Sequence, residues 1–222
     1  MIDDDVLPDD VFEQLGKVSF LFEEGKKQKA MRKLKTLKKR CPNNRYLRSI
    51  AFNLSYAADY LDDALEDARF LAEYARDSED KLNLAECLIR MDRVEEADKV
   101  LSGCSDLAGR SGRYHFLLGI LKNRHGDIVS ANKELMTLFS LEKKDEWPYR
   151  MSGHLLLAKN LLDEGNLSAA KEEARLAARE AEDPETLADA IGAIDSFIIA
   201  YEATKEVVKS GKKSEPGDRR FH

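Results

Sequence analysis

A ten-residue pattern recurs five times along this chain, and the repetition limits the folds available to it more than any other feature. Each copy has a glycine or an aspartate five residues before an alanine, and the alanines are Ala30, Ala64, Ala97, Ala131 and Ala170. Successive alanines are 34, 33, 34 and 39 residues apart. Small or apolar residues follow each alanine by four and by seven residues. This spacing is typical of the buried stripe on one face of an α-helix.

A second helical pattern precedes each of these glycines and aspartates. Three of the preceding segments align without gaps, over residues 82–91, 116–125 and 155–164. The alignment places a small residue at one shared position, occupied by Ala85, Gly119 and Ala158. We expect this residue to face the alanine of the following helix, so that the two backbones approach closely. The glycine or aspartate between the helices ends the first one, because glycine adopts a positive φ at little cost.

This helix–turn–helix period, with small residues at two positions, resembles the tetratricopeptide repeat (TPR) family. Residues 84–101 carry the clearest match, and residues 25–44 match the second helix of the family and its closing Pro-Asn-Asn. Phe52 departs from the pattern, because it stands where the second unit should have a small residue. The resemblance implies an all-α fold, a right-handed α-solenoid of about five TPR-like repeats. Other α-solenoids built from helical hairpins are the alternative.

The repeats are expected to pack in series, since a single hairpin cannot bury its apolar face. Their expected bounds are residues 11–44, 45–77, 78–110, 111–145 and 150–182. A closing helix over residues 184–209 is expected to cover the last repeat, because Asp183 is a suitable N-cap and an apolar stripe follows. Residues 1–209 then form one superhelical domain. Residues 210–222 have almost nothing apolar to bury and are expected to be disordered.

Composition favours a cytoplasmic protein. The acidic residues 1–10 differ from a signal peptide, and no apolar stretch approaches the ~20 residues of a membrane span. The three cysteines form no C-x-x-C pair, which predicts buried free thiols in a reducing compartment. The formal net charge of −6 disfavours general attraction to nucleic acid or to anionic membranes.

No pattern in the sequence supports catalysis. There is no phosphate-binding loop, no dinucleotide fingerprint and no His-x-x-x-His pair. His115 and His154 occupy matching positions in their repeats, which predicts a packing role for both. We therefore expect neither an enzyme nor a bound metal or cofactor.

Two further segments have open interpretations. Nine of the fifteen residues 26–40 are Lys or Arg, which predicts either a solvated helix face or a patch for an acidic protein or RNA. No aromatic residue lies within this run, so base stacking is unsupported. The longest alanine spacing places about five extra residues in the segment 141–153, which contains Trp147. That segment is either a contact loop or a plug for the seam between two repeats.

The resemblance implies that the first helices of the repeats line a concave surface that holds a partner. The residues expected to bind the partner are Phe22, Tyr46, Asn53, Tyr56, Glu86, Ile89, Arg90, Arg113, Phe116, Ile120, Asn123, Arg124 and Lys159. The same interpretation places Phe12, Leu15, Ser49, Leu82 and Leu162 on this surface. A groove with so many apolar and aromatic side chains is predicted to be occupied.

The predicted function is that of a non-catalytic adaptor or complex subunit. Its apolar groove would bind an amphipathic helix or an extended peptide of another protein. One TPR subclass grips the acidic C-termini of chaperones with a Lys and an Asn one turn apart, and no such pair stands at the matching positions here. The alternatives are a TPR-type chaperone that holds a hydrophobic client and a self-assembling structural protein, for instance a homodimer. Neither a membrane nor a nucleic acid is expected as a partner.

Overall fold

The computed structural model describes residues 6–75, 77–141 and 147–180, and within these ranges it contains helices and no strand. The α-helices are α1 (Asp9–Glu23), α2 (Lys27–Arg40), α3 (Arg45–Ala57), α4 (Leu61–Glu73), α5 (Glu79–Arg90), α6 (Val94–Ser102), α7 (Gly112–Arg124), α8 (Ile128–Ser140), α9 (Trp147–Asp163) and α10 (Leu167–Arg179). A short 3₁₀-helix, η1 (Ser105–Leu107), follows α6. The predicted closing helix, residues 184–209, and the predicted disordered tail, residues 210–222, lie outside the described residues.

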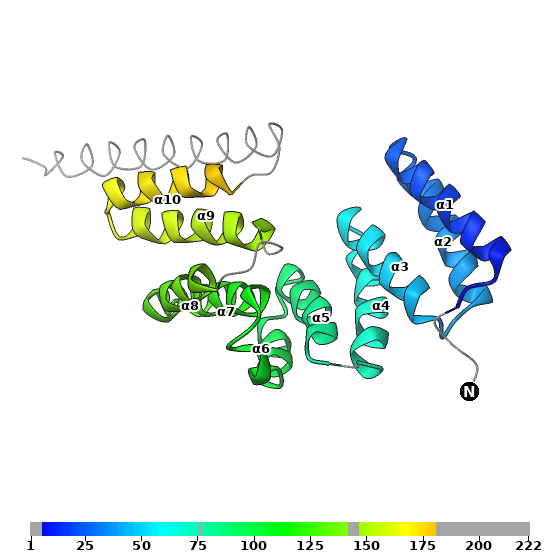
Figure 1. Cartoon of the computed structure of the whole chain (residues 1–222), viewed down its shortest axis with the longest axis horizontal. Helices are drawn as coiled ribbons and strands as arrows, with labels where there is room; N and C mark the ends of the chain where they lie inside the picture. Colours follow the sequence, from blue (N-terminus) through cyan, green and yellow to red (C-terminus); the bar gives the residue numbers. More distant parts are fainter. Residues whose placement is uncertain (1–5, 76, 142–146, 181–222) are drawn as a thin grey trace, which may run out of the picture.

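The ten α-helices pair into five antiparallel hairpins, from α1 with α2 to α9 with α10. The hairpins follow one another along an arc, with α3, α5 and α7 on its inner side and α6 and α8 outside them (Figure 1). The prediction of an all-α solenoid is confirmed. No helix in the described part of the chain combines the length and the apolar character needed to cross a membrane.

The same turn joins the two helices of every hairpin. The five turn residues all have positive φ: Gly25 (72°), Asp59 (68°), Asp92 (59°), Gly126 (78°) and Gly165 (83°). In each turn the next residue donates its backbone N–H to a carbonyl five residues earlier, for example from Asp127 to Lys122 over 2.9 Å. This bond satisfies a carbonyl that would otherwise be left without a partner at the end of the first helix. Within the described residues, the chain therefore reverses by the same kind of turn in all five hairpins.

The five repeated alanines lie on the buried faces of the second helices of the hairpins. Four of them are fully buried and Ala170 is 2% exposed. In the fourth hairpin, a Cβ atom on Gly119 would lie 3.1 Å from Leu135 Cδ2 and 3.6 Å from the Ala131 carbonyl oxygen. The small residues therefore permit a close approach of α7 and α8. Phe52, which departs from this pattern, is buried and stacks on Tyr56 with ring centroids 5.5 Å apart.

The apolar core runs along the solenoid in three clusters. One cluster joins α1, α2 and α3, the largest spans α3 to α7, and the third lies between α8 and α9. Each cluster includes side chains from neighbouring hairpins, so every hairpin is stabilised by the next one.

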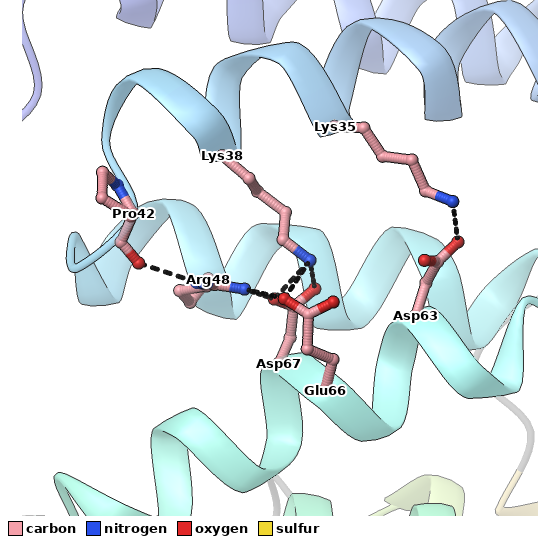
Figure 2. A network of polar contacts seen from close by, with 7 residues as sticks. All are labelled: Lys35, Lys38, Pro42, Arg48, Asp63, Glu66 and Asp67. Carbon is pink, nitrogen blue, oxygen red and sulfur yellow. Dashed lines mark hydrogen bonds and ion pairs between the residues drawn. The ribbon is translucent and has the colours of Figure 1, made fainter.

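A buried network of charges joins the first hairpin to the second (Figure 2). The carboxylate of Asp67 on α4 is fully buried, 2.7 Å from Lys38 Nζ on α2 and 2.6 Å from Arg48 Nη1 on α3. Arg48 also contacts Glu66 at 2.7 Å and donates through Nε to the Pro42 carbonyl oxygen at 3.0 Å. Three helices from two repeats thus meet at one carboxylate.

The different burial of the three cysteines leads to a prediction for thiol labelling. Cys87 and Cys104 are buried and Cys41 is half-buried, and burial raises the pKa of the Cys87 thiol to about 11 and also raises that of Cys104. Because the thiolate is the nucleophile, Cys41 should react with a maleimide at neutral pH long before the other two. Mass spectrometry across a urea titration would show labelling of Cys87 and Cys104 only as helicity is lost. Early labelling of Cys87 in the folded chain would contradict its place in the core.

Candidate functional site

A cleft lies between the first helices of the second and third hairpins. Its volume is about 350 Å³, and its lining consists of Arg45, Tyr46, Ser49, Leu71, Asp80 and Asn83. Arg45, Tyr46 and Ser49 come from α3, Leu71 from α4, and Asp80 and Asn83 from α5. The cleft therefore combines a half-exposed aromatic ring, an apolar side chain, a hydroxyl and an amide. We call it the α3–α5 cleft.

Charged groups at the cleft are neutralised by one another. Arg45 Nη2 lies 3.0 Å from Asp80 Oδ2, and the same guanidinium also donates to the backbone carbonyl of Tyr74. The amide oxygen of Asn83 accepts a hydrogen bond from Arg113 Nη2 at 2.8 Å. These contacts hold the polar side chains in place from both sides of the cleft.

A series of arginines links successive hairpins. Arg90 lies over the Tyr56 ring at 4.6 Å, donates to the Tyr56 carbonyl oxygen and pairs with Asp59 at 3.1 Å. Arg124 makes the equivalent ion pair, with Asp92 at 2.6 Å, one hairpin further on. Burial raises the pKa of the Tyr56 hydroxyl above its ordinary value. Such bridges fix the orientation of one repeat on the next.

The structure brings several predicted site residues together. Arg113 Nε donates to Glu86 at 3.1 Å, and its guanidinium lies 5.7 Å from the centroid of the Tyr149 ring. The Phe116 ring lies 5.8 Å from that of Tyr149, and Ile120 packs on the same core. Asn123 donates to Asn160, which in turn donates to Asn132 over 2.7 Å. The contacts connect α5 and α7 with α9.

The remaining predicted residues do not reach this group. Phe22 on α1 contacts Lys27, and Lys159 on α9 pairs with Asp163 on its own helix. Tyr46 and Asn53 are exposed on α3, and Tyr46 is the one that lines the cleft. Phe12 is exposed on α1, in the terminal hairpin.

Four residues predicted to line the groove belong to the core. Ile89 is 5% exposed, and Leu15, Leu82 and Leu162 are at most 5% exposed. Each stands three residues before or four residues after the position of the small residue on its helix, so it shares the buried face. The prediction that they face a partner is therefore wrong, and the inner side of the arc is more polar than the sequence interpretation implied.

Sequence reasoning missed Arg45, Leu71, Asp80 and Asn83, which complete the cleft. A signal for the arginine links was present, however. Arg90 and Arg124 each follow an aspartate turn at the same position of the next repeat, whereas Ala57 stands at that position after the Gly25 turn. An acid at the turn and a base one repeat later form a complementary pair that spacing alone could have found.

The two matched histidines have packing roles, as predicted, and each pairs with a glutamate on the second helix of its own hairpin. His115 Nδ1 lies 2.8 Å from Glu134 Oε2, and His154 Nδ1 lies 2.7 Å from Glu173 Oε2. His154 also stacks on Phe139 with ring centroids 3.8 Å apart. Among the residues that the structure describes, no group of His, Cys, Asp and Glu is arranged to hold a metal ion. The side chain of Trp147, for which two roles were open, lies outside the described part.

Comparison with known proteins identifies the fold. No protein-family model and no curated protein sequence matches the chain. Among solved structures, a crystal structure of MamA is similar with a TM-score of 0.55 and 16% identity, covering 73% of this chain and 93% of that chain. MamA 41-end from Desulfovibrio magneticus RS-1 has a TM-score of 0.59 and 13% identity, with coverages of 79% and 97%. A MamA RS-1 double mutant has a TM-score of 0.57, also with 13% identity and coverages of 79% and 96%.

Similarity at such low identity shows the fold alone. Together with the period, the repeated turn and the buried small residues, it defines a tetratricopeptide-type α-solenoid.

Proposed function

We propose that this chain is a non-catalytic protein-interaction module that binds an extended segment of a partner protein at the α3–α5 cleft. The observation that carries this proposal is the cleft itself, which opens between two hairpins and presents Tyr46, Ser49 and Asn83 together. Hydroxyl and amide groups can form hydrogen bonds with the backbone of an extended peptide, while the tyrosine ring and Leu71 offer an apolar contact to one of its side chains.

The size of the cleft favours an extended peptide over a helix. A helix with its side chains is about 10–12 Å across, so even two turns of it would exceed the cleft volume of about 350 Å³. One or two side chains of an extended segment fit this volume. The sequence predicted two kinds of partner segment, an amphipathic helix or an extended peptide. Of these two, we expect the cleft to bind the extended peptide.

The polar contacts around the cleft support a preorganised site. Asn83 is held by Arg113 of the next hairpin, and Arg45 is held by Asp80 across the cleft. A site whose side chains are already ordered loses less conformational entropy on binding.

A client-holding chaperone has less support than the interaction module. Such a protein needs a broad apolar surface, yet Leu82 and Ile89, which were expected to contribute to it, are buried in the core. Self-assembly and the cytoplasmic location stay predictions, and light scattering across a dilution series would test the first.

Blocking the cleft tests the proposed function. Peptides selected from a displayed library against the full chain should bind the variant Ser49→Trp about 30-fold more weakly, or ~2 kcal/mol, because the indole fills the cleft. Titration calorimetry would measure the affinities. The matched control is Ser102→Trp, at an exposed position on α6.

Circular dichroism should show the same helicity for both variants. Equal affinity of the selected peptides for Ser49→Trp and for the unaltered chain would refute the cleft as the binding site.

A further inference from the structure

The charge of this chain is distributed very unevenly. Residues 25–58 contain eleven Lys or Arg and no Asp or Glu, although the formal net charge of the whole chain is −6. The next 48 residues, 59–106, contain fifteen Asp or Glu and six Lys or Arg. A basic segment of the solenoid therefore adjoins an acidic one.

Nine of the eleven cations of the basic segment form two sets, since Lys26 pairs with Glu24 at 2.7 Å and Lys27 lies over the Phe22 ring at 5.9 Å. The first set is paired with carboxylates of neighbouring helices: Lys35 with Asp63 at 3.0 Å, Lys38 with Asp67 at 2.7 Å, Arg40 with Asp10 at 2.7 Å, Arg45 with Asp80 at 3.0 Å and Arg48 with Asp67 at 2.6 Å. Figure 2 shows how three of these side chains, Lys35, Lys38 and Arg48, point towards the carboxylates of α4. This set stabilises the junction of the first two hairpins.

The second set lies on α2 outside the face that packs on the core. Lys29, Arg32 and Lys39 are exposed and Lys33 is partly exposed. Within residues 6–75, 77–141 and 147–180, none of these four side chains has an ion pair or a side-chain hydrogen bond. The face of α2 that packs on the core is formed by Ala30, Met31, Leu34 and Leu37. We call the four outward cations the outer basic strip.

We propose that the outer basic strip binds a short acidic segment of a partner protein. Like charges three and four residues apart destabilise a helix, and Lys29, Arg32 and Lys33 have this spacing. Carboxylates of a partner would relieve this repulsion, because they would supply the negative charge that α2 itself lacks. The strip extends about 15 Å from Lys29 to Lys39 at 1.5 Å per residue. That length accommodates about four or five residues of an extended chain.

The composition of the strip and its surroundings favours a peptide over a nucleic acid. No aromatic residue lies on α2, so nothing there can stack on a base. The acidic segment 59–106 adjoins the basic one in the chain, and its carboxylates repel a long phosphate chain more than a short acidic peptide.

The same geometry disfavours a membrane surface. Lipid binding by a basic helix needs apolar side chains beside the cations, and the exposed Phe12 and Phe20 lie on α1. On α2 itself the apolar side chains Ala30, Met31, Leu34 and Leu37 are buried in the core, so the helix that carries the strip offers no exposed apolar side chain beside the cations.

Charge reversal tests this proposal. The probe is a fluorescent oligoglutamate peptide, titrated into the full chain at low salt and followed by anisotropy. The variant Lys29→Glu, Arg32→Glu, Lys33→Glu, Lys39→Glu should bind it at least about tenfold more weakly. The control variant Lys99→Glu, Lys133→Glu, Lys171→Glu, Arg179→Glu has the same net charge and changes exposed residues only. It should bind the probe within about twofold of the unaltered chain.

The other outcomes each decide against the proposal. Equal loss in both variants would mean attraction by net charge alone, and no binding by the unaltered chain would mean a solvated face. Tighter binding of an oligouridylate of equal length would indicate nucleic acid, and tighter binding of phosphatidylserine vesicles would indicate a membrane.

The neutral variant with glutamine at the same four positions should also lose binding, which excludes misfolding by the introduced carboxylates. Ser49→Trp should bind oligoglutamate normally, so this test is independent of the α3–α5 cleft.

Discussion

Replacement of Asp67 by alanine is expected to lower the free energy of unfolding by about 3–5 kcal/mol, because it leaves the largely buried cations Lys38 and Arg48 with only the exposed carboxylate of Glu66 as a counter-charge. Asp67 is fully buried, and both Lys38 and Arg48 lie within 2.7 Å of its carboxylate. The remaining neighbour, Glu66, has a side chain that is 61% exposed and cannot replace it. Urea denaturation followed by circular dichroism would measure the change.

Two controls make this result specific. Asp63→Ala removes the partly exposed ion pair with Lys35 and should cost at most about 1 kcal/mol. The triple variant Lys38→Met, Arg48→Met, Asp67→Leu replaces the whole buried network by apolar side chains and should recover most of the loss. A cost for Asp67→Ala no larger than that for Asp63→Ala would show that the network contributes nothing to the junction of the first two hairpins.

Replacement of Ala131 by leucine is expected to destabilise the chain by about 3 kcal/mol, at the upper end of the range for overpacking. Ala131 is fully buried where α7 crosses α8, and its carbonyl oxygen lies 3.6 Å from the Cβ position of Gly119. The three added carbons have no space unless the two helices separate. The midpoint and the slope of urea denaturation would both be measured, since separation of the helices also changes the surface exposed on unfolding.

The same substitution at Val129 is the control. Val129 lies on α8 only two positions earlier and is 80% exposed, so leucine should change stability there by less than about 0.5 kcal/mol. If Ala131→Leu were as stable as Val129→Leu, the repeated alanines would not mark close helix crossings.

The turns show how far sequence reasoning reaches. Glycine and aspartate at the five turn positions were predicted to end the first helix of each repeat, and all five residues have positive φ. The prediction succeeds because a left-handed residue is a local requirement that few residue types meet. The pairing of Asp59 with Arg90 extends into the next repeat, and it was not predicted.

The predicted groove shows where that reasoning fails. Ile89 was predicted to contact the partner, although it follows Ala85 by four residues and lies on the same buried face. Residues on a helix are separated by about 100° around its axis, so a shift of one position in the assumed register moves a side chain from the groove to the core. Asp80 and Asn83 line the cleft instead, and they lie two positions before and one position after Leu82, which was predicted to line the groove.

The order of residues alone determines three features of the fold: the positions of the helices, the reversal of the chain after each first helix and the packing of the five hairpins in series. Each of these depends on contacts within one helix or between two neighbouring helices. The division of the basic run into paired and unpaired cations depends instead on side chains from α2, α3 and α4, which meet only after the hairpins have stacked. The cleft has the same origin, since its walls belong to two different repeats whose separation no periodicity in the sequence encodes.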